Sequence, residues 1–221
     1  MNNAEKNLVE RLKPGLAIAG FNWLKSRAMF VRKEPYGFSS LSWTSHSTSD
    51  EGGRLELAPV LGVRHNSVED LVNQLGLIYG DDNKRFTTTV TRGLGLFPFT
   101  ESKDNKQYIR LASIDADVEH AASAITAMLN SDGEDFFKRY SSLLECSQGL
   151  NNPLESKVHP LCNNFPRRAY YGVAAAIFAE NDRVPELVSQ YLHFAMSVLP
   201  KQYDQIATRL EQLTMAAQSA R

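Results

Sequence analysis

The chain has 221 residues, 43% of them hydrophobic and 22% charged, which is the composition of a globular protein with a sizeable core rather than of a disordered chain. Lysine and arginine together number 24 against 25 aspartates and glutamates, so the formal net charge is -1, and no block of like charge stands out. Because phosphate contacts dominate the affinity of nucleic-acid-binding proteins, this balance argues against a strong nucleic-acid binder and against a protein held on an anionic membrane surface.

The N-terminus and the cysteine content indicate a cytoplasmic protein. Residues 1–7 lack both the basic region and the apolar run of a signal peptide. No window approaches the roughly 18 consecutive apolar residues that cross a bilayer. Cys146 and Cys162 are the only cysteines, and a single pair does not indicate a disulfide framework. We therefore expect a cytoplasmic location and no membrane partner.

The first element is predicted to be an amphipathic helix, because Leu8, Leu12 and Leu16 recur at four-residue spacing. Pro14 should kink this helix and Gly20 should end it. Strand-like sequence then follows in five segments, at 26–33, 36–46, 54–63, 85–92 and 107–113. Turn-forming residues separate several of them, for example at 48–53, so the sheet should be mainly antiparallel.

Single residues in these segments give finer expectations. Pro59 should lie at a bulge or a sheet edge, because proline has no N–H to donate to a ladder. Ser67 begins a capping-box-like pattern ahead of an apolar helical stripe at 68–75, and Ser131 begins a second one ahead of Phe136.

The remainder of the chain is predicted to be helical, over 115–129, 134–144, 166–179, 185–199 and 203–217. Asp115 should cap the first of these helices. The loop at 149–160, rich in Asn, Pro and Gly, is the best candidate for a domain boundary. We expect an α+β domain over 1–150, with a mainly antiparallel sheet of about five strands and helices on one face, and a C-terminal helical extension packed on it over 151–221.

Two stretches resemble a bacterial family catalogued as a domain of unknown function, whose members begin with a helix ending in Gly-Phe and then a strand with an aromatic residue and an arginine. The residues that carry the resemblance are Leu12-Lys13-Pro14-Gly15-Leu16, Gly20-Phe21, Phe30-Val31-Arg32, and, within 115–150, Phe136-Phe137, Ser142 and Leu144. It covers residues 1–150 and leaves the C-terminal helices as an addition. The resemblance implies an α+β fold and supplies no catalytic residues, because the family has no settled activity.

No catalytic constellation is recognisable in the sequence. Gly93-Leu94-Gly95 lacks the third glycine and the following helix of a dinucleotide-binding loop. His159-Pro160-Leu161-Cys162 is at most half of a zinc site. A cysteine with a histidine could form a nucleophile and base, but nothing around Cys146 or Cys162 is typical of one. A turn, a loop with a buried thiol and core packing are the favoured interpretations, so we predict no catalytic residues, no metal and no cofactor.

Arginines recur in the predicted strands. If neighbouring strands align them on one face, their guanidinium groups could bind an acidic partner or ligand, and nearby aromatic residues would strengthen such a surface. A solvated sheet face is the commoner outcome, and Trp43 could equally lie in the core. The candidate binding residues are Arg32, Tyr36, Trp43, Arg64, Arg92 and Arg110.

These observations favour a non-enzymatic protein-binding module, for example a bacterial immunity or antitoxin-like protein that neutralises a toxin by direct binding. This specific form is an association with small bacterial proteins of similar description. Two alternatives stay open: an enzyme or small-ligand-binding protein with a pocket between the sheet and the C-terminal helices, and a homodimeric scaffold that uses the helical tail. The oligomeric state is left open.

Overall fold

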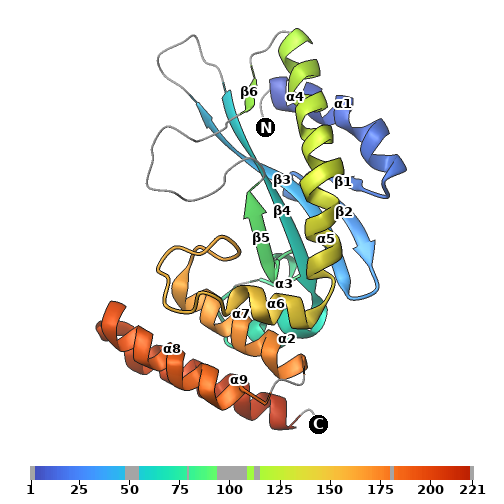
Figure 1. The fold of residues 1–221 in the computed structure, drawn as a ribbon. Coiled ribbons are helices and arrows are strands. Elements are labelled where there is room, and N and C mark those ends of the chain that lie inside the picture. The colour runs from blue at the N-terminus through green and yellow to red at the C-terminus, as the bar shows by residue number, and fades with distance from the viewer. Residues whose placement is uncertain are drawn as a thin grey trace. The chain divides into compact units, whose positions relative to one another are not determined.

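The computed structural model describes residues 3–47, 55–78, 80–93, 109–111, 115–179 and 182–219. The predicted turn at 48–53 and the second glycine of the Gly93-Leu94-Gly95 pair lie outside these ranges. The chain divides into two compact units, each made of two stretches (Figure 1). We call residues 1–62 with 92–138 the sheet unit, and residues 63–91 with 139–221 the helical unit.

The sheet has the strand order β1-β2-β3-β4-β5, and β6 also pairs with β4. The pairings of β1 with β2, of β2 with β3 and of β4 with β6 are all antiparallel. The strands are β1 (Asn22–Leu24), β2 (Met29–Glu34), β3 (Gly37–Ser47), β4 (Leu55–His65), β5 (Val90–Gly93) and β6 (Ile109–Leu111), and a 3-10 turn, η1 (Lys25–Arg27), joins the first two. The predicted α+β fold with a mainly antiparallel sheet is confirmed.

Two helices of the sheet unit, α1 (Asn3–Ile18) and α4 (Asp115–Met128), pack against each other and against strands β1 and β6 respectively (Figure 1). The predicted apolar stripe of α1 is fully buried at Leu8, Leu12 and Leu16. The helix ends as expected: the N–H of Gly20 donates to Ala17 O (3.0 Å) and that of Phe21 to Leu16 O (2.9 Å). Gly20 has φ +82°, the left-handed conformation that this C-terminal motif requires.

The predicted helix start at Ser131 is wrong. Residues that follow α4 stay helical through a π-helical turn, η2 (Leu129–Gly133), and run directly into α5 (Glu134–Tyr140). The Ser131 hydroxyl donates back to Ala127 O (3.1 Å) instead of capping a new helix. Gly133 permits this close turn, because a Cβ there would lie 2.9 Å from Leu129 Cδ1.

The helical unit is built around α7 (Phe165–Phe178), which contacts α2, α6, α8 and α9. Small residues let the neighbouring helices approach: Ala169, Gly172, Ala174, Ala175 and Ala176 are all buried. Its helices are α2 (Asn66–Asn73), α3 (Asp81–Lys84), α6 (Leu143–Leu150), α7, α8 (Val184–Val198) and α9 (Tyr203–Ser219), with a 3-10 turn, η3 (Pro200–Gln202), before α9. The C-terminal helices predicted from 166, 185 and 203 are therefore present. None of the described helices combines the length and the apolar character needed to cross a membrane.

Two local expectations, about α2 and about the strand at 85–92, are corrected. Helix α2 begins at Asn66, with His65 as its N-cap and no side-chain cap, so Ser67 lies inside the helix. The strand expected over 85–92 begins only at Val90, and the hydroxyls of the preceding Thr87 and Thr89 donate to Glu69. Pro59 lies within the interior strand β4. The residues before it, 55–57, pair with β6, and beyond it the carbonyl oxygen of Val63 accepts from Thr89 N–H.

The predicted boundary after residue 150 separates α6 from α7, which pack against each other inside the helical unit. The loop between them contains a cis Asn152–Pro153 peptide bond.

Candidate functional site

Arg32, one of the predicted binding residues, is engaged within the sheet unit. Its guanidinium donates to Glu34 Oε1 (2.8 Å) and to Glu134 Oε1 (2.8 Å). The same group lies over the rings of Phe21 and Phe137, at 4.8 and 5.1 Å from their centroids. Arg32 therefore joins β2 to α5 through charge and ring contacts.

The predicted aromatic residues also belong to the sheet unit. Trp43 stacks on Trp23, with ring centroids 6.0 Å apart, and its Nε1–H donates to Glu5 Oε1 (3.4 Å). The Tyr36 hydroxyl lies 3.5 Å from Ser39 Oγ. Arg92 is half-buried in β5, and the side chain of Arg110 lies outside the described part of the structure, although its backbone pairs with Glu56. A binding role for these residues stays a prediction.

Arg64 belongs to the helical unit and is only 5% exposed. Its Nε donates to Asn66 Oδ1 (2.9 Å), and Nη1 donates to the carbonyl oxygens of Lys84 (2.8 Å) and Thr87 (3.0 Å). Nη1 also lies 3.7 Å from Oε2 of Glu69, which is fully buried. In this conformation the Arg64 guanidinium bonds within the protein, and a binding role for Arg64 stays a prediction.

Glu69 is the centre of this buried network. Its carboxylate accepts from the hydroxyls of Thr87 (2.5 Å), Thr89 (3.1 Å) and Tyr171 (3.0 Å). The Tyr171 hydroxyl in turn accepts from Arg167 Nη2 (3.0 Å). Burial raises the pKa of Glu69, whereas the hydrogen bonds from Thr87 and Tyr171 and the charge of Arg64 oppose that rise. The network ties α2 and the start of β5 to α7.

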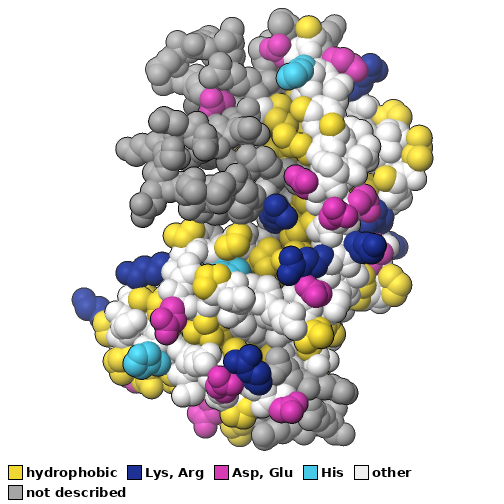
Figure 2. Space-filling model, viewed as in Figure 1, with side chains coloured by type: hydrophobic (Ala, Val, Ile, Leu, Met, Phe, Trp, Pro, Cys, Tyr) yellow, Lys and Arg dark blue, Asp and Glu magenta, His cyan; other side chains and the backbone are white. Residues whose placement is uncertain are grey.

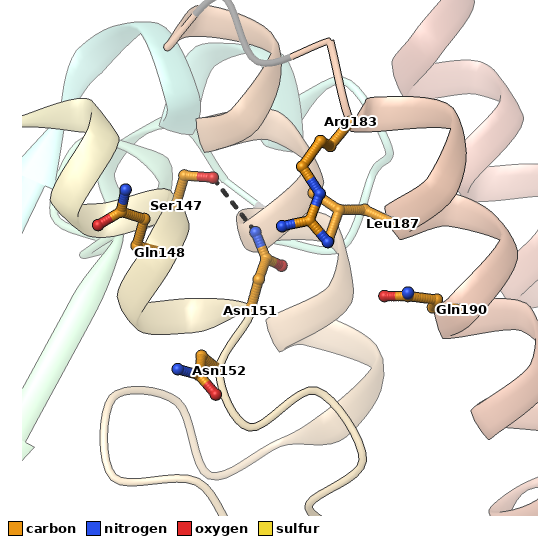
Figure 3. A pocket seen from close by; sticks show the side chains of 7 residues that line it. All are labelled: Ser147, Gln148, Asn151, Asn152, Arg183, Leu187 and Gln190. Carbon is orange, nitrogen blue, oxygen red and sulfur yellow. Dashed lines mark hydrogen bonds between the residues drawn. The ribbon is translucent and has the colours of Figure 1, made fainter.

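A cavity of about 420 Å³ opens in the helical unit, between the end of α6, the loop after it and the first turns of α8. Six of its seven lining residues are of polar or charged types: Ser147, Gln148, Asn151, Asn152, Arg183, Leu187 and Gln190 line it. Figure 3 shows Arg183 and Gln190 facing the cavity from the α8 side, opposite Ser147 and Asn151. Arg183, Leu187 and Gln190 share one helix face because they are four and three residues apart. The cavity is our candidate functional site.

Asn151 forms a fixed wall of the cavity. Its amide nitrogen donates to Ser147 Oγ (3.3 Å), as drawn in Figure 3, and to Gly172 O (3.2 Å). Its Oδ1 accepts from the hydroxyl of the buried Tyr191 (2.6 Å). Gly172 is necessary here, since a Cβ at that position would lie 2.3 Å from Asn151 Oδ1. The wall is thereby held to α6, α7 and α8 before any ligand arrives.

Arg168 on α7 fixes the loop that carries Asn152 by hydrogen bonds, and its side chain is fully buried. Nη1 donates to Pro153 O (3.2 Å) and Nη2 to Leu154 O (2.5 Å). A guanidinium suits this task because its planar fork serves two neighbouring carbonyl groups at once. The loop lacks regular secondary structure, so its carbonyl oxygens have no backbone partners in a helix or sheet. The guanidinium donors of Arg168 supply hydrogen bonds to two of them instead.

His159 holds the same loop in a defined tautomer. Leu161 N–H donates to Nδ1 (3.2 Å), so Nδ1 carries no proton and Nε2–H donates to Asn152 O (3.3 Å). The imidazole is therefore neutral, and protonating it would place a second hydrogen against the Leu161 N–H. Burial, followed by the charge of Arg168, lowers the pKa of His159. Both ring nitrogens of His159 are thus engaged in hydrogen bonds, and the ring positions Asn152.

Acidification should destabilise the protein through this histidine. The folded-state pKa of His159 lies below the ordinary 6.5 of the unfolded chain. The neutral ring therefore stabilises the folded state fully above pH 6.5, and this contribution to the free energy of unfolding is lost as the pH falls from 6.5 towards the folded-state pKa. We expect the free energy of unfolding, measured by urea denaturation, to fall between pH 7.5 and pH 5.5. His65 contributes in the same direction, since burial lowers its pKa too. A His159→Asn variant should show a shallower dependence than the wild type, and an unchanged slope would contradict the assignment.

The polar groups of the cavity differ in how they are used. Within the described part of the chain, the side-chain amides of Gln148 and Asn152 form no hydrogen bond, and both residues are exposed. Arg183 donates to Glu186 (3.0 and 3.2 Å), and Gln190 Nε2 donates to the same carboxylate (3.0 Å). The cavity therefore presents donors and acceptors for a polar ligand.

The two cysteines, the other chemical candidates, are engaged within the protein. Burial raises the pKa of Cys146 to about 12, and its thiol donates to Tyr140 O (3.3 Å). Burial raises the pKa of Cys162 as well. Thiols that stay protonated are poor nucleophiles. The described residues contain no group of three or more His, Cys, Asp or Glu side chains that could hold a metal ion.

Sequence reasoning does not single out the cavity. Its residues are amides, a serine, a leucine and an exposed arginine, which are ordinary surface types without a diagnostic spacing. The signal that the sequence does carry in this region is the Asn-rich loop at 149–160, whose composition indicates a domain boundary rather than a binding site. The chain matches no family model, no curated protein and no solved structure.

Proposed function

We propose that the chain is a non-enzymatic protein-binding module, and that the cavity of the helical unit receives a polar segment of the partner. The observation that carries the proposal is the lining: four side-chain amides, a serine, a leucine and an arginine around about 420 Å³. This volume lies within the roughly 300–1,000 Å³ typical of ligand pockets.

The amide lining favours a polypeptide as the bound group. Each primary amide offers an acceptor and donors, which are the complements of a backbone N–H and C=O. Gln148 and Asn152, whose amides form no hydrogen bond with the described residues, are available for such pairing. A pre-formed wall at Asn151 reduces the entropy that binding would cost.

Apolar side chains near the cavity support a contact with another protein. Leu187 lies in the lining, and the exposed Leu144 is one helical turn before Gln148 on α6. Further exposed apolar residues of the helical unit are Val158, Phe178, Met196 and Met215. On the face drawn in Figure 2, hydrophobic side chains of this unit are exposed in several small groups. Apolar contacts with a polar anchor are typical of protein interfaces.

The test is capture of partners by the tagged protein at low and high salt, read by quantitative mass spectrometry. A Gln190→Trp variant fills part of the cavity from an exposed helix position, and Arg139→Gln is a matched control outside it. We expect a stoichiometric partner that the wild type and the control retain and the Gln190→Trp variant loses. Equal capture by all three proteins would contradict the cavity as the binding site.

Neutralisation of a toxin is the specific form of this proposal, in a cytoplasmic setting. It predicts that co-expression restores growth of cells that make the captured partner, and that Gln190→Trp abolishes the rescue. A partner that is harmless when expressed alone would argue against this form and leave protein binding in place.

A small polar ligand is the second candidate function, favoured by the cavity volume of about 420 Å³ and the fixed Asn151 wall. A metabolite screen by thermal shift distinguishes it from protein binding. A compound that raises the melting temperature of the wild type but not of Gln190→Trp would favour this candidate.

A further inference from the structure

The charge of the cavity indicates which polar group it accepts. Among the seven residues that line it, Arg183 is the only one with a formal charge, and none is acidic. We propose that the bound segment carries a carboxylate and that Arg183 and Gln190 receive it. This inference rests on the proposed function, because it names the chemistry that the same cavity recognises.

In the structure, Arg183 and Gln190 already bind a carboxylate of the protein, that of Glu186. Nε and Nη2 of Arg183 donate to the two oxygens of Glu186, at 3.0 and 3.2 Å, and Gln190 Nε2 donates to Oε1 of the same group at 3.0 Å. Two lining residues, the α8 N-cap Arg183 and Gln190 within the helix, therefore converge on one carboxylate with a forked geometry that suits this anion. The hydrogen bonds from Arg183 lower the pKa of Glu186, which agrees with donors that favour the charged form.

Glu186 can be exchanged for a ligand carboxylate at little cost. The Arg183 side chain is 64% exposed and that of Glu186 is 52% exposed. Exposed ion pairs of this kind contribute little to stability, because water and salt screen them. A carboxylate held in the cavity would in addition meet the amides of Gln148 and Asn152, which form no hydrogen bond with Glu186. Glu186 is thus an internal competitor that occupies the donors in the free protein.

Two sources of the carboxylate are possible, a polypeptide C-terminus and an acidic side chain. Three probes separate them: N-acetyl-trialanine with a free C-terminus, its C-terminal amide, and N-acetyl-Ala-Glu-Ala amide. Binding of each probe to the full chain is measured by NMR titration, with the side-chain signals of Gln190, Asn152 and the Arg183 Nε–H as reporters. We expect the free acid or the glutamate peptide to bind about tenfold tighter than the neutral amide.

Variants then assign the effect to the two donors. Arg183→Gln should weaken binding of the carboxylate probe about tenfold, and Glu186→Ala should strengthen it several-fold by removing the competitor. The matched control is Arg139→Gln, which removes another exposed arginine paired with a nearby glutamate and should leave the affinity unchanged. The altered residues are exposed, so circular dichroism should show the same fold for each variant.

An ion pair with only a structural role would not produce opposite changes in probe affinity for the Arg183→Gln and Glu186→Ala variants. Equal binding of the acidic and neutral probes would overturn the carboxylate inference while the cavity remained a peptide site. Absence of any probe-induced shift at the cavity signals would also overturn it, and the partner-capture experiment would then judge the proposed function separately.

Discussion

Replacing Glu69 with alanine should lower the free energy of unfolding by about 3–5 kcal/mol, because it removes the buried carboxylate beside the Arg64 guanidinium, while Asp70, 3.6 Å away, is exposed and compensates the charge less well. The same change removes the acceptor of the Thr87, Thr89 and Tyr171 hydroxyls. Urea denaturation at pH 7.5 measures the loss. The variant should also unfold more readily around α7, which hydrogen exchange of the α7 amides reports.

The control for this variant is Glu145→Ala, which breaks an exposed pair with Arg139 and should cost no more than about 1 kcal/mol. A Tyr171→Phe variant tests the link between α2 and α7. In a double-mutant cycle, Tyr171→Phe should cost less in the Glu69→Ala background than in the wild type, because the two groups bind each other. Losses that simply add, or a Glu69→Ala loss no larger than that of the control, would show that the network does not stabilise the fold.

Replacing Gly172 with alanine should lower the free energy of unfolding by about 1–3 kcal/mol, although alanine is the better helix former. The added Cβ would lie 2.3 Å from Asn151 Oδ1 and 2.9 Å from the Tyr191 hydroxyl. Both atoms must move, and with them the hydrogen bond that joins them. Thermal and urea unfolding measure the effect, and displacement of the Asn151 side-chain amide signal in NMR shows that the cavity wall has moved.

Gly15→Ala provides the matched control, because Gly15 is also helical but has no neighbouring atom within 4 Å of the place that an added methyl group would take. We expect it to raise stability by about 0.5–1 kcal/mol, so the two glycine variants should differ in sign. An Asn151→Ala background should reduce the cost of Gly172→Ala. If Gly172→Ala stabilised the protein as Gly15→Ala does, the tight packing of Asn151 against α7 would be disproved.

Long periodic signals in the sequence are sufficient to predict most helices. The spacing of Leu8, Leu12 and Leu16 identifies α1, and the need for a left-handed residue after it identifies Gly20. Such signals succeed because burial and backbone conformation are decided within one or two turns of chain. Patterns that depend on a single polar residue fail: Ser131 resembles a helix cap, but the turn at Gly133 keeps the chain helical.

The site could not be predicted, because its geometry depends on distant pairings. Arg64 resembles a residue of an exposed sheet face, yet it pairs with Glu69, which in turn binds Tyr171, 102 positions later. Asn151 and Tyr191 are also far apart in sequence and meet only when α7 and α8 are packed. No local pattern marks an asparagine as a cavity wall. The family resemblance likewise names no residue of the cavity.

The division of each unit into two stretches of chain has a consequence for synthesis. Residues 63–91 leave the ribosome before the sheet unit has received 92–138 and long before α7 exists. Until Tyr171 emerges, Glu69 remains hydrated and α2 has no central helix on which to pack. The helical unit can therefore complete its packing only after residues 139–221 have been made, and the long sequence separation of its contacts should slow this step. A chain stopped after residue 150 would contain α2 and α6 without the helix that buries both.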